Sequence, residues 1–203
     1  MMWQAATPRL VLASASPSRR ALLEQAGLRF AVQPAAVDET EAKRGARAAG
    51  MSAQDTALLL ADLKAERVAG HDPDLLVIGS DQLLVCADRW FDKPIDLADA
   101  REHLLALRGR THELATAVVC RRGGQMVWHH LARPRLTMRA FSEEFLEDYL
   151  ASEGMALTTT VGAYRLEGLG VHLFDRVEGE HAAILGLPLL PLLGFLRQHG
   201  VLR

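Results

Sequence analysis

Hydrophobic positions in the first thirty residues change from a continuous run to a helical spacing. The run at 10–13 breaks off at Ser14, and apolar residues then recur at helical intervals up to Gly27. This pattern predicts a strand, a tight turn and a helix. Ser16 is placed to cap the helix, Pro17 occupies its first position and Gly27 follows its end. The chain therefore begins with a βα unit.

The next segments predict a strand, a loop and a second helix. Residues 28–32 predict the strand, and the charged, Gly- and Ala-rich residues 41–51 predict a mobile loop. Ser52 and Asp55 form a capping pattern that opens a helix running to about Ala69. Strands and helices thus alternate in this part of the chain.

A buried strand is expected next. The continuous apolar run at 75–79 predicts it, and Asp81 follows where this run gives way to Gly79 and Ser80. A further strand is expected at 83–86. Ligands of open α/β sheets bind at the carboxyl ends of strands, so Asp81 is a candidate site residue. A carboxylate there can ligate Mg²⁺ or orient a water for attack on phosphorus, or it can simply cap a turn.

The second half mixes helices with hairpins. It is expected to contain, in order, a helix from Asp96 to about Gly109, strands at 112–120 and 125–139 around a turn at 123–124, a helix from Ser142 to about Gly154, a strand at 171–174 and a helix opening at 187–188. Early βα alternation followed by hairpins favours a mixed-sheet α/β fold. Because no linker separates independent parts, residues 1–203 are expected to form a single domain.

Composition narrows the class of protein. The 203 residues are 49% hydrophobic, and the formal net charge is −2. This balance gives no basic excess for nucleic acid and no acidic tail for disorder. Cys86 and Cys120 lie in apolar runs, which indicates buried, reduced thiols and a reducing compartment. With neither a leader-like N-terminus nor an apolar run of about 20 residues, the chain is expected to be cytoplasmic and to bind neither membranes nor nucleic acid.

The N-terminus of the first helix is a candidate anion site. Its free backbone N–H groups and the positive end of its dipole attract negative charge. Arg19 and Arg20 lie in the same first turn, where basic residues oppose the dipole unless an anion neutralises them. The alternative is an ordinary βα unit whose arginines face water.

Other charged residues indicate a binding site only when they are considered together. Asp38 and Glu39 form a solvated turn or, with Asp81, a site for Mg²⁺, which takes one or two carboxylates plus substrate phosphates. Lys64 and Lys93 are surface lysines or, together with Arg19, neutralise a polyphosphate. The sequence patterns of P-loops, zinc-binding helices and serine-hydrolase elbows are absent.

Seven short segments together form a specific signature. They lie at residues 12–20, 37–40, 60–65, 77–82, 92–94, 162–168 and 185–189. Among them are Leu-Ala-Ser-Ala-Ser-Pro-Ser-Arg-Arg, Val-Ile-Gly-Ser-Asp-Gln and Gly-Ala-Tyr-Arg-Leu-Glu-Gly. In this order they resemble the Maf family of nucleoside triphosphate pyrophosphatases. The resemblance implies an elongated mixed-sheet α/β fold, similar to that of inosine triphosphatase, with a cleft between two lobes.

The resemblance also implies a reaction and the residues that perform it. Maf proteins hydrolyse a nucleoside triphosphate to the monophosphate and pyrophosphate with a divalent metal, Mg²⁺ or Mn²⁺. Asp81 matches the family's proton acceptor, and Glu39 and Asp81 match its metal-side carboxylates. The phosphate-contacting positions fall on Ser14, Arg19, Lys64 and Lys93. A homodimer is implied as well.

Three further positions, Ser18, Gln82 and Glu167, match those that separate subfamilies by base. At these three positions the group acting on dTTP and UTP usually has Arg, Thr and Gln. The group acting on 7-methyl-GTP is similar to Trp, Gln and Glu at the same positions. Gln82 and Glu167 match the second group, and Ser18 matches neither. An anionic acceptor at 167 also suits a base that carries a positive charge and N–H donors. The sequence therefore favours a modified substrate such as 7-methyl-GTP.

Two other kinds of function stay open. One is a pyrophosphatase for inosine or xanthosine triphosphate, or for dTTP and UTP, which a substrate panel distinguishes. The other is a non-catalytic nucleotide sensor that regulates cell division, for which binding without hydrolysis would be the sign. Asp81, Lys64, Lys93 and Arg19 together favour turnover, and with it a housecleaning role in the nucleotide pool.

Overall fold

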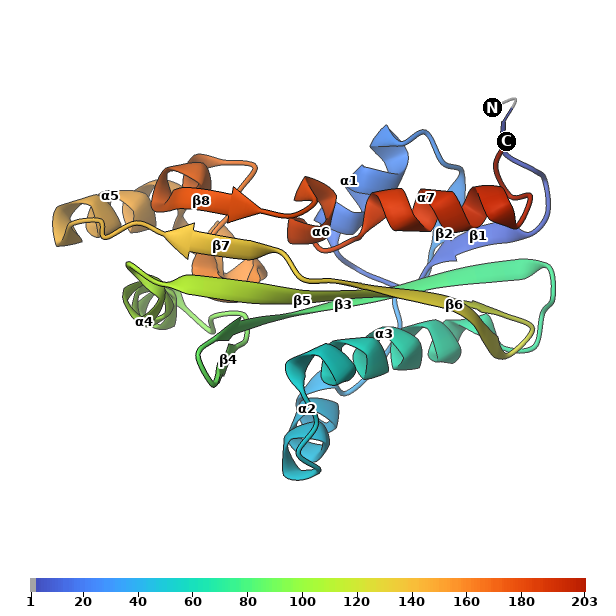
Figure 1. The fold of residues 1–203 in the computed structure, drawn as a ribbon, viewed down its shortest axis with the longest axis horizontal. Coiled ribbons are helices and arrows are strands. Elements are labelled where there is room, and N and C mark those ends of the chain that lie inside the picture. The colour runs from blue at the N-terminus through green and yellow to red at the C-terminus, as the bar shows by residue number, and fades with distance from the viewer. Residues whose placement is uncertain (1–2) are drawn as a thin grey trace. The chain divides into compact units, whose positions relative to one another are not determined.

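Eight strands form one mixed sheet within residues 3–203, the part of the chain that the computed structural model describes (Figure 1). The strands are β1 (Arg9–Leu12), β2 (Phe30–Val32), β3 (Leu75–Cys86), β4 (Arg89–Phe91), β5 (Thr111–Arg122), β6 (Gln125–Ala132), β7 (Arg135–Met138) and β8 (Phe174–Glu178). Their order is β2-β1-β3-β5-β7-β8, with β4 paired to β3 and β6 paired to β5. Strands β2, β1 and β3 are parallel, whereas the pairs β3–β4, β5–β6, β5–β7 and β7–β8 are antiparallel. The mixed α/β prediction is therefore confirmed.

The chain divides into two compact units, each assembled from separate stretches. The first unit contains the chain up to Asp81, Thr116–Ala132 and Glu180–Arg203. The second contains Gln82–Ala115 and Arg133–Gly179. The single domain over residues 1–203 and the cleft between two lobes stay predictions.

Helices cover both faces of the sheet in the first unit. They are α1 (Pro17–Gln25), α2 (Glu39–Ala48), α3 (Ala53–Ala69), α6 (His181–Ile184) and α7 (Leu189–Gln198). Figure 1 shows α1 and α7 on one side of β3 and α3 on the other. The second unit holds α4 (Leu97–Leu107), α5 (Glu143–Glu153) and three 3₁₀ segments at Gly154–Thr159, Val161–Ala163 and Leu169–Leu173.

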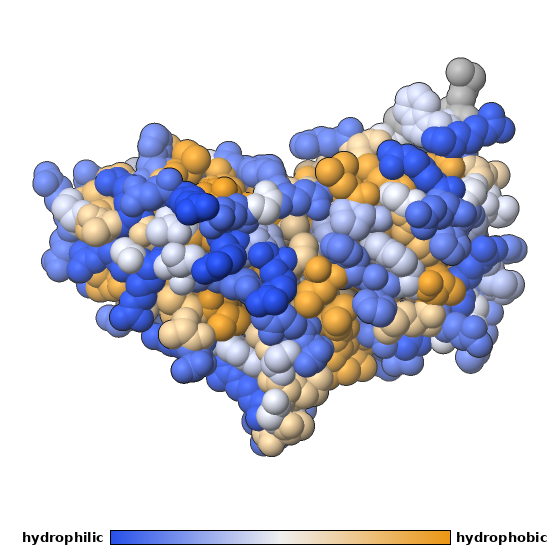
Figure 2. Space-filling model, viewed as in Figure 1, coloured by the Kyte–Doolittle hydropathy of each residue, from blue (hydrophilic) through white to orange (hydrophobic). Residues whose placement is uncertain are grey.

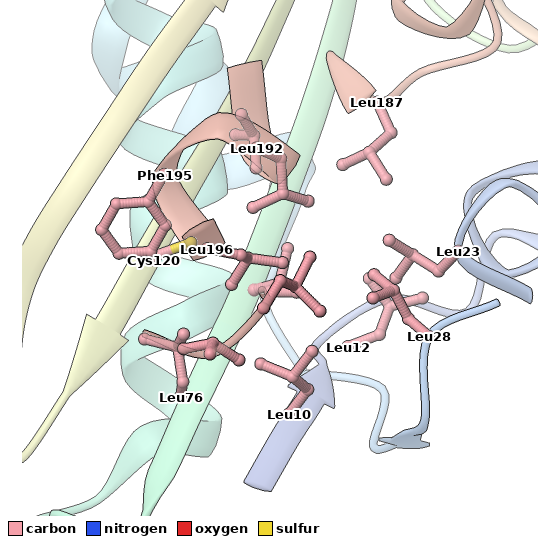
Figure 3. Packing of buried hydrophobic residues seen from close by; sticks show 14 of the residues in the cluster. Leu10, Leu12, Leu23, Leu28, Leu76, Cys120, Leu187, Leu192, Phe195 and Leu196 are labelled. Atoms are coloured by element: carbon pink, nitrogen blue, oxygen red, sulfur yellow. The ribbon is translucent and has the colours of Figure 1, made fainter. Parts of the chain in front are cut away.

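One hydrophobic cluster joins β1, β3 and β5 to α1 and α7. Leu12 of β1, Leu23 of α1 and Leu196 of α7 are fully buried, and Figure 3 shows them within one interior. Leu76 and Ile78 enter the same cluster from β3. Because successive side chains of a strand point to opposite faces, the even positions of this part of β3 face α1 and α7. Its odd positions face α3.

The first helix forms as its sequence predicts. The Ser16 side chain accepts a hydrogen bond from the backbone N–H of Arg19 at 3.4 Å, and Pro17 begins the helix. Gly27 follows the helix with a φ of +72°, in the left-handed region that glycine tolerates. The capping predictions at Ser52 and Ser142 are confirmed too, because each accepts a hydrogen bond from the backbone N–H three residues on.

The mobile loop predicted at 41–51 is wrong, because helix α2 spans Glu39–Ala48. Asp38 caps it by accepting from the backbone N–H of Glu41 at 2.9 Å. Acidic residues in its first turn and Arg47 in its last turn complement the helix dipole. These end signals outweigh the polar, glycine-containing composition that suggested a loop.

The break predicted between two strands at 79–83 is also wrong. Strand β3 runs without interruption from Leu75 to Cys86, so Asp81 lies inside the strand rather than at its carboxyl end. Gly79 does not form a turn. A Cβ there would overlap the carbonyl oxygen of Ala61 and lie 2.9 Å from the Cβ of Ala65, both in α3. The glycine therefore permits close helix–sheet packing.

Smaller differences occur in the hairpins. The turn at Gly123-Gly124 is confirmed by φ values of +56° and +80°. The strand predicted at 125–139 is divided into β6 and β7 around Pro134, which has no N–H for the ladder. The strand predicted at 171–174 begins only at Phe174, because Leu169–Leu173 forms a 3₁₀ segment.

Hydrophobic and hydrophilic residues intermingle on the face shown in Figure 2. In the part of the chain described, no helix combines the length and the hydropathy that crossing a membrane requires. Cys86 and Cys120 are free and buried, as predicted.

Candidate functional site

Lys64 is a buried cation at the centre of an ion-pair cluster in the first unit. Its ammonium group lies 2.5 Å from Oδ1 of Asp81 and 2.7 Å from Oε1 of Glu39. Three different elements supply these side chains: α3, β3 and the first residue of α2. Only 7% of Lys64 is exposed, and Ala61 and Ala65 of the same helix are fully buried. A lysine is seldom buried unless its charge is paired, which the two carboxylates accomplish.

Asp81 retains an oxygen atom that the protein does not use. Its side chain is buried, and Oδ2 has no hydrogen-bond partner among the described residues. Leaving such an atom unsatisfied costs about 1–3 kcal/mol. The arrangement therefore favours a group supplied from outside, either a cation or a water molecule.

The charge of Glu39 is favoured by its surroundings. Partial burial acts to raise the pKa of Glu39, but the charge and hydrogen bond of Lys64 lower it below its ordinary value, and Lys43 and Arg19 add to this. Glu39 is therefore an anion at neutral pH, with a side chain that is 44% exposed. Carboxylate oxygens are the ligands that Mg²⁺ and Mn²⁺ prefer. Glu39 and Asp81 fit such a cation.

Arg19 holds three parts of the first unit together. Its Nε donates to the carbonyl of Gly186 at 2.8 Å, and one terminal nitrogen donates to the carbonyl of Ser80 at 2.8 Å and to Ser14 Oγ at 3.2 Å. Burial lowers the pKa of Arg19, against the opposing charges of Asp81 and Glu39. The alternative that the arginines of α1 face water is thus wrong for Arg19. It holds for Arg20, which is exposed and pairs with Glu24.

Ser14 follows β1 and lies within this network. Its hydroxyl oxygen accepts from the backbone N–H of Ser16 and from Arg19, both at 3.2 Å. The position is consistent with an anion site at the start of α1, where the positive end of the helix dipole attracts negative charge. Ser18 lies in the same first turn and is partly buried.

Ser80 is a residue that sequence reasoning missed. Its hydroxyl lies 2.7 Å from the carbonyl of Ala117 and 2.8 Å from that of Gly186, and its own carbonyl accepts from Arg19. The sequence signal was present, because a serine that continues the apolar face of Leu76 and Ile78 needs partners. Interpreting Gly79 and Ser80 as a turn concealed it.

The remaining predicted site residues belong to the second unit. Gln82 follows Asp81 in β3 and is partly buried, whereas Lys93 is exposed after β4. Glu167 is 35% exposed, and its Oε1 lies 3.7 Å from Nε of Arg165. Arg165 also pairs with Glu153 at 3.3 Å. The structure thus brings Ser14, Arg19, Glu39, Lys64 and Asp81 together in one unit and places Gln82, Lys93 and Glu167 in the other.

The first unit thus combines part of a mixed sheet with a lysine–carboxylate cluster. The family model described as "Maf-like protein" matches residues 9–199, so the chain belongs to the Maf family. The resemblance found in the seven sequence segments is therefore confirmed.

Named relatives match nearly the whole chain. A "Nucleoside triphosphate pyrophosphatase" of Granulibacter bethesdensis is 60% identical over 194 residues, 96% of this chain and 98% of the relative. One of Rhodospirillum rubrum with the same name is 54% identical, covering 98% of both chains. A "7-methyl-GTP pyrophosphatase" of Rhizobium etli is 48% identical, covering 97% of this chain and 98% of that protein.

A solved structure shows a weaker likeness. The dITP/XTP pyrophosphatase of Mycobacterium abscessus matches with a TM-score of 0.41 and 18% identity, over 66% of this chain and 75% of that one. A likeness of this size does not bear on substrate choice.

Proposed function

We propose that the protein hydrolyses 7-methyl-GTP, or a nucleoside triphosphate with a similarly modified base, to the monophosphate and pyrophosphate. The enzyme class, nucleoside triphosphate pyrophosphatase, follows from the family and from relatives of that name at 60% and 54% identity. The observation that carries the reaction is the ion-pair cluster of buried Lys64 and Asp81 with the partly exposed Glu39, in which Oδ2 of Asp81 is unsatisfied.

In this proposal Asp81 accepts a proton from the attacking water. The water oxygen bonds to the α-phosphorus, the bond from this phosphorus to the bridging oxygen breaks, and pyrophosphate leaves with the electron pair. Oδ2 is the oxygen available for the proton, because Lys64 occupies Oδ1. Removing a positioned general base typically costs ~10²–10⁴-fold in rate.

The cationic residues have a second role. A triphosphate brings about four negative charges, and cations near the leaving group offset charge that moves onto it. We assign Lys64 and Lys93 to this role, with the Ser14 hydroxyl as a phosphate donor at the positive end of the α1 dipole. Because the guanidinium of Arg19 is engaged by Gly186, Ser80 and Ser14, it acts on phosphate mainly through its charge and by holding Ser14.

A divalent cation, Mg²⁺ or Mn²⁺, belongs to the proposal because Maf proteins generally use one. Glu39 and Asp81 are the residues that would hold it. When bound, it supplies charge neutralisation and Lewis-acid polarisation of the phosphate oxygens. The homodimer that the resemblance implies and the cytoplasmic location expected from the sequence are also part of the proposal.

Base choice is assigned to Gln82 and Glu167. N7-methylation gives guanine a positive charge, and its N1–H and exocyclic amine are donors, so a carboxylate complements it by attraction and by accepting hydrogen bonds. A pyrimidine offers Glu167 mainly carbonyls. The relatives named 7-methyl-GTP pyrophosphatase, at 48% identity, support this choice. Ser18 supplies no plane on which a base would stack.

The test is a panel of 7-methyl-GTP, GTP, UTP, dTTP, ITP and XTP with the purified protein. We expect 7-methyl-GTP to have the highest kcat/KM, and Glu167→Gln to narrow its lead over UTP. Phosphorus NMR should show the monophosphate and pyrophosphate in equal amounts. A wild-type preference for UTP or dTTP would reject the base assignment, and orthophosphate with a diphosphate would reject the reaction. Tight binding without hydrolysis in Mg²⁺ or Mn²⁺ would favour the sensor alternative instead.

A further inference from the structure

Glu153 is a buried carboxylate in an unfavourable position. It is the last residue of α5, where a negative charge opposes the negative end of the helix dipole. Its side chain is only 8% exposed, so desolvation adds to the cost. Two contacts offset these costs. Oε2 lies 3.3 Å from a terminal nitrogen of Arg165, and Oε1 accepts from the backbone N–H of Leu169 at 3.2 Å.

These contacts fix both ends of the loop that carries Glu167. Within the loop, the N–H of Gly168 donates to the carbonyl of Arg165 at 3.1 Å. A Cβ at Gly168 would lie 3.2 Å from Oε1 of Glu153, and one at Gly170 would overlap the carbonyl of Arg165. The loop is therefore closed tightly around the Glu153 carboxylate.

Arg165 is shared between two carboxylates. Its Nη1 lies 3.3 Å from Glu153, and its Nε lies 3.7 Å from Glu167, so the buried partner has the closer contact. Burial raises the pKa of Tyr149, and the charges of Glu153 and Glu167 add to this effect, so both carboxylates act on one neighbourhood. An arginine released from Glu153 would be free to form a full bidentate pair with Glu167.

We infer that Glu153 is a positioning residue that sets base selectivity. It retains Arg165, fixes the loop through Leu169 and so leaves the acceptor oxygens of Glu167 available to the base. The inference rests on the proposed function in assigning Glu167 to base recognition. Glu153 itself needs no contact with the nucleotide.

The decisive variant is Glu153→Gln. The amide keeps the size of the side chain and can still accept from Leu169, but it cannot pair with the charge of Arg165. We expect the KM for 7-methyl-GTP to rise about tenfold, the loss of roughly one charged hydrogen bond. The kcat and the kinetics with UTP should stay near those of the wild type, so the ratio of the two kcat/KM values should fall.

Two further variants separate positioning from a general structural role. Asp148→Asn removes an exposed carboxylate from the same helix and should change neither the KM for 7-methyl-GTP nor the ratio of the two kcat/KM values. Arg165→Gln removes the neutralising partner of Glu167, so the preference for the cationic base over GTP should increase, opposite in direction to the effect of Glu153→Gln. The double variant Glu153→Gln/Glu167→Gln should have the same base selectivity as Glu167→Gln alone, because Glu153 affects selectivity only through Glu167.

The outcomes are distinguishable. A base ratio unchanged in Glu153→Gln, or equal losses on every nucleotide, would overturn the inference while the wild-type preference for 7-methyl-GTP stood. A wild-type enzyme without that preference would reject the proposed base choice. In that case the inference would depend on whether the two variants change the order of preferred bases in the same way. If Glu153→Gln and Glu167→Gln change this order alike, the positioning role of Glu153 is still supported. If Glu153→Gln leaves the order unchanged, that role is rejected. If Glu153→Gln did not fold, the sign of the Arg165→Gln effect would decide.

Discussion

Asp81 combines burial, a bond to one cation and an oxygen atom left without a partner. Asp81→Asn keeps the shape of the side chain but removes its charge and basicity. We expect kcat to fall by ~10²–10⁴-fold, as for loss of a general base, with the fold retained by circular dichroism. Asp88→Asn, at an exposed position, is the matched control and should retain full activity. Activity of Asp81→Asn within a few-fold of the wild type would remove Asp81 from the mechanism.

His112 makes the stability of the protein depend on pH. It is buried beside Tyr164, and burial lowers its pKa from 6.5 to about 4. Between these values the unfolded chain binds a proton that the folded chain does not. The contribution to stability is therefore complete above pH 6.5 and is lost as the pH falls towards 4.

This dependence predicts a slope of about 1.4 kcal/mol per pH unit for the single group. Urea unfolding at pH 7 and pH 5 should show a smaller loss of stability for His112→Gln than for the wild type. His181→Gln, at an exposed histidine, should behave as the wild type. Equal pH dependence in all three proteins would mean that His112 titrates normally.

At the scale of elements, Gly79 determines how closely α3 approaches β3. A Cβ at this position would overlap the carbonyl oxygen of Ala61, a backbone atom that cannot rotate away as a flexible side chain can. We expect Gly79→Ala to displace the helix, lengthen the contact of Lys64 with Asp81 and destabilise the fold by about 1–3 kcal/mol. Denaturant unfolding and kcat measure both effects.

Gly45→Ala is the matched control for this prediction. Gly45 lies in α2, and a Cβ there would meet nothing within 4 Å. Alanine should therefore stabilise the helix, by about 0.5–1 kcal/mol. Equal effects of the two substitutions would show that the helix–strand spacing tolerates a methyl group.

Elements with local end signals were predictable from the sequence, and those that depend on distant neighbours were not. Ser16, Ser52 and Ser142 locate helices because each cap is satisfied within three residues. The continuity of β3 through Gly79 depends on small residues of α3 far away in sequence. A prediction from neighbouring residues alone therefore divides β3 into two strands.

In the candidate site too, the residue types were predictable from the sequence, whereas their contacts were not. The residue types Asp81, Lys64 and Glu39 could be selected from the sequence, chiefly through the family resemblance. Their mutual ion pairs depend on three elements meeting, which no local pattern encodes. The engagement of Arg19 by Gly186, 167 residues later, was equally beyond local reasoning.

At the scale of the whole molecule, the stability of the first unit depends on its last helix. Leu196 of α7 is fully buried in the cluster that includes β1, β3 and α1. Leu196→Ala should lower the free energy of unfolding by about 2–5 kcal/mol, through lost burial and the cavity left behind. Leu190→Ala, on the same helix but 67% exposed, should change it little. Similar losses from both substitutions in urea unfolding would contradict this.

The alternation of side chains along β3 restricts how its length can evolve. Ser80 serves the face under α1, whereas Asp81, its neighbour in sequence, serves the face under α3. Inserting one residue after Ile78 would exchange the two faces, so that the carboxylate would enter the apolar interior and the serine would meet Lys64. Inserting two would preserve the faces. Single-residue insertions and deletions between Ile78 and Asp81 should therefore abolish activity. In homologues, the number of residues between the apolar start of this strand and its aspartate should differ only by even numbers.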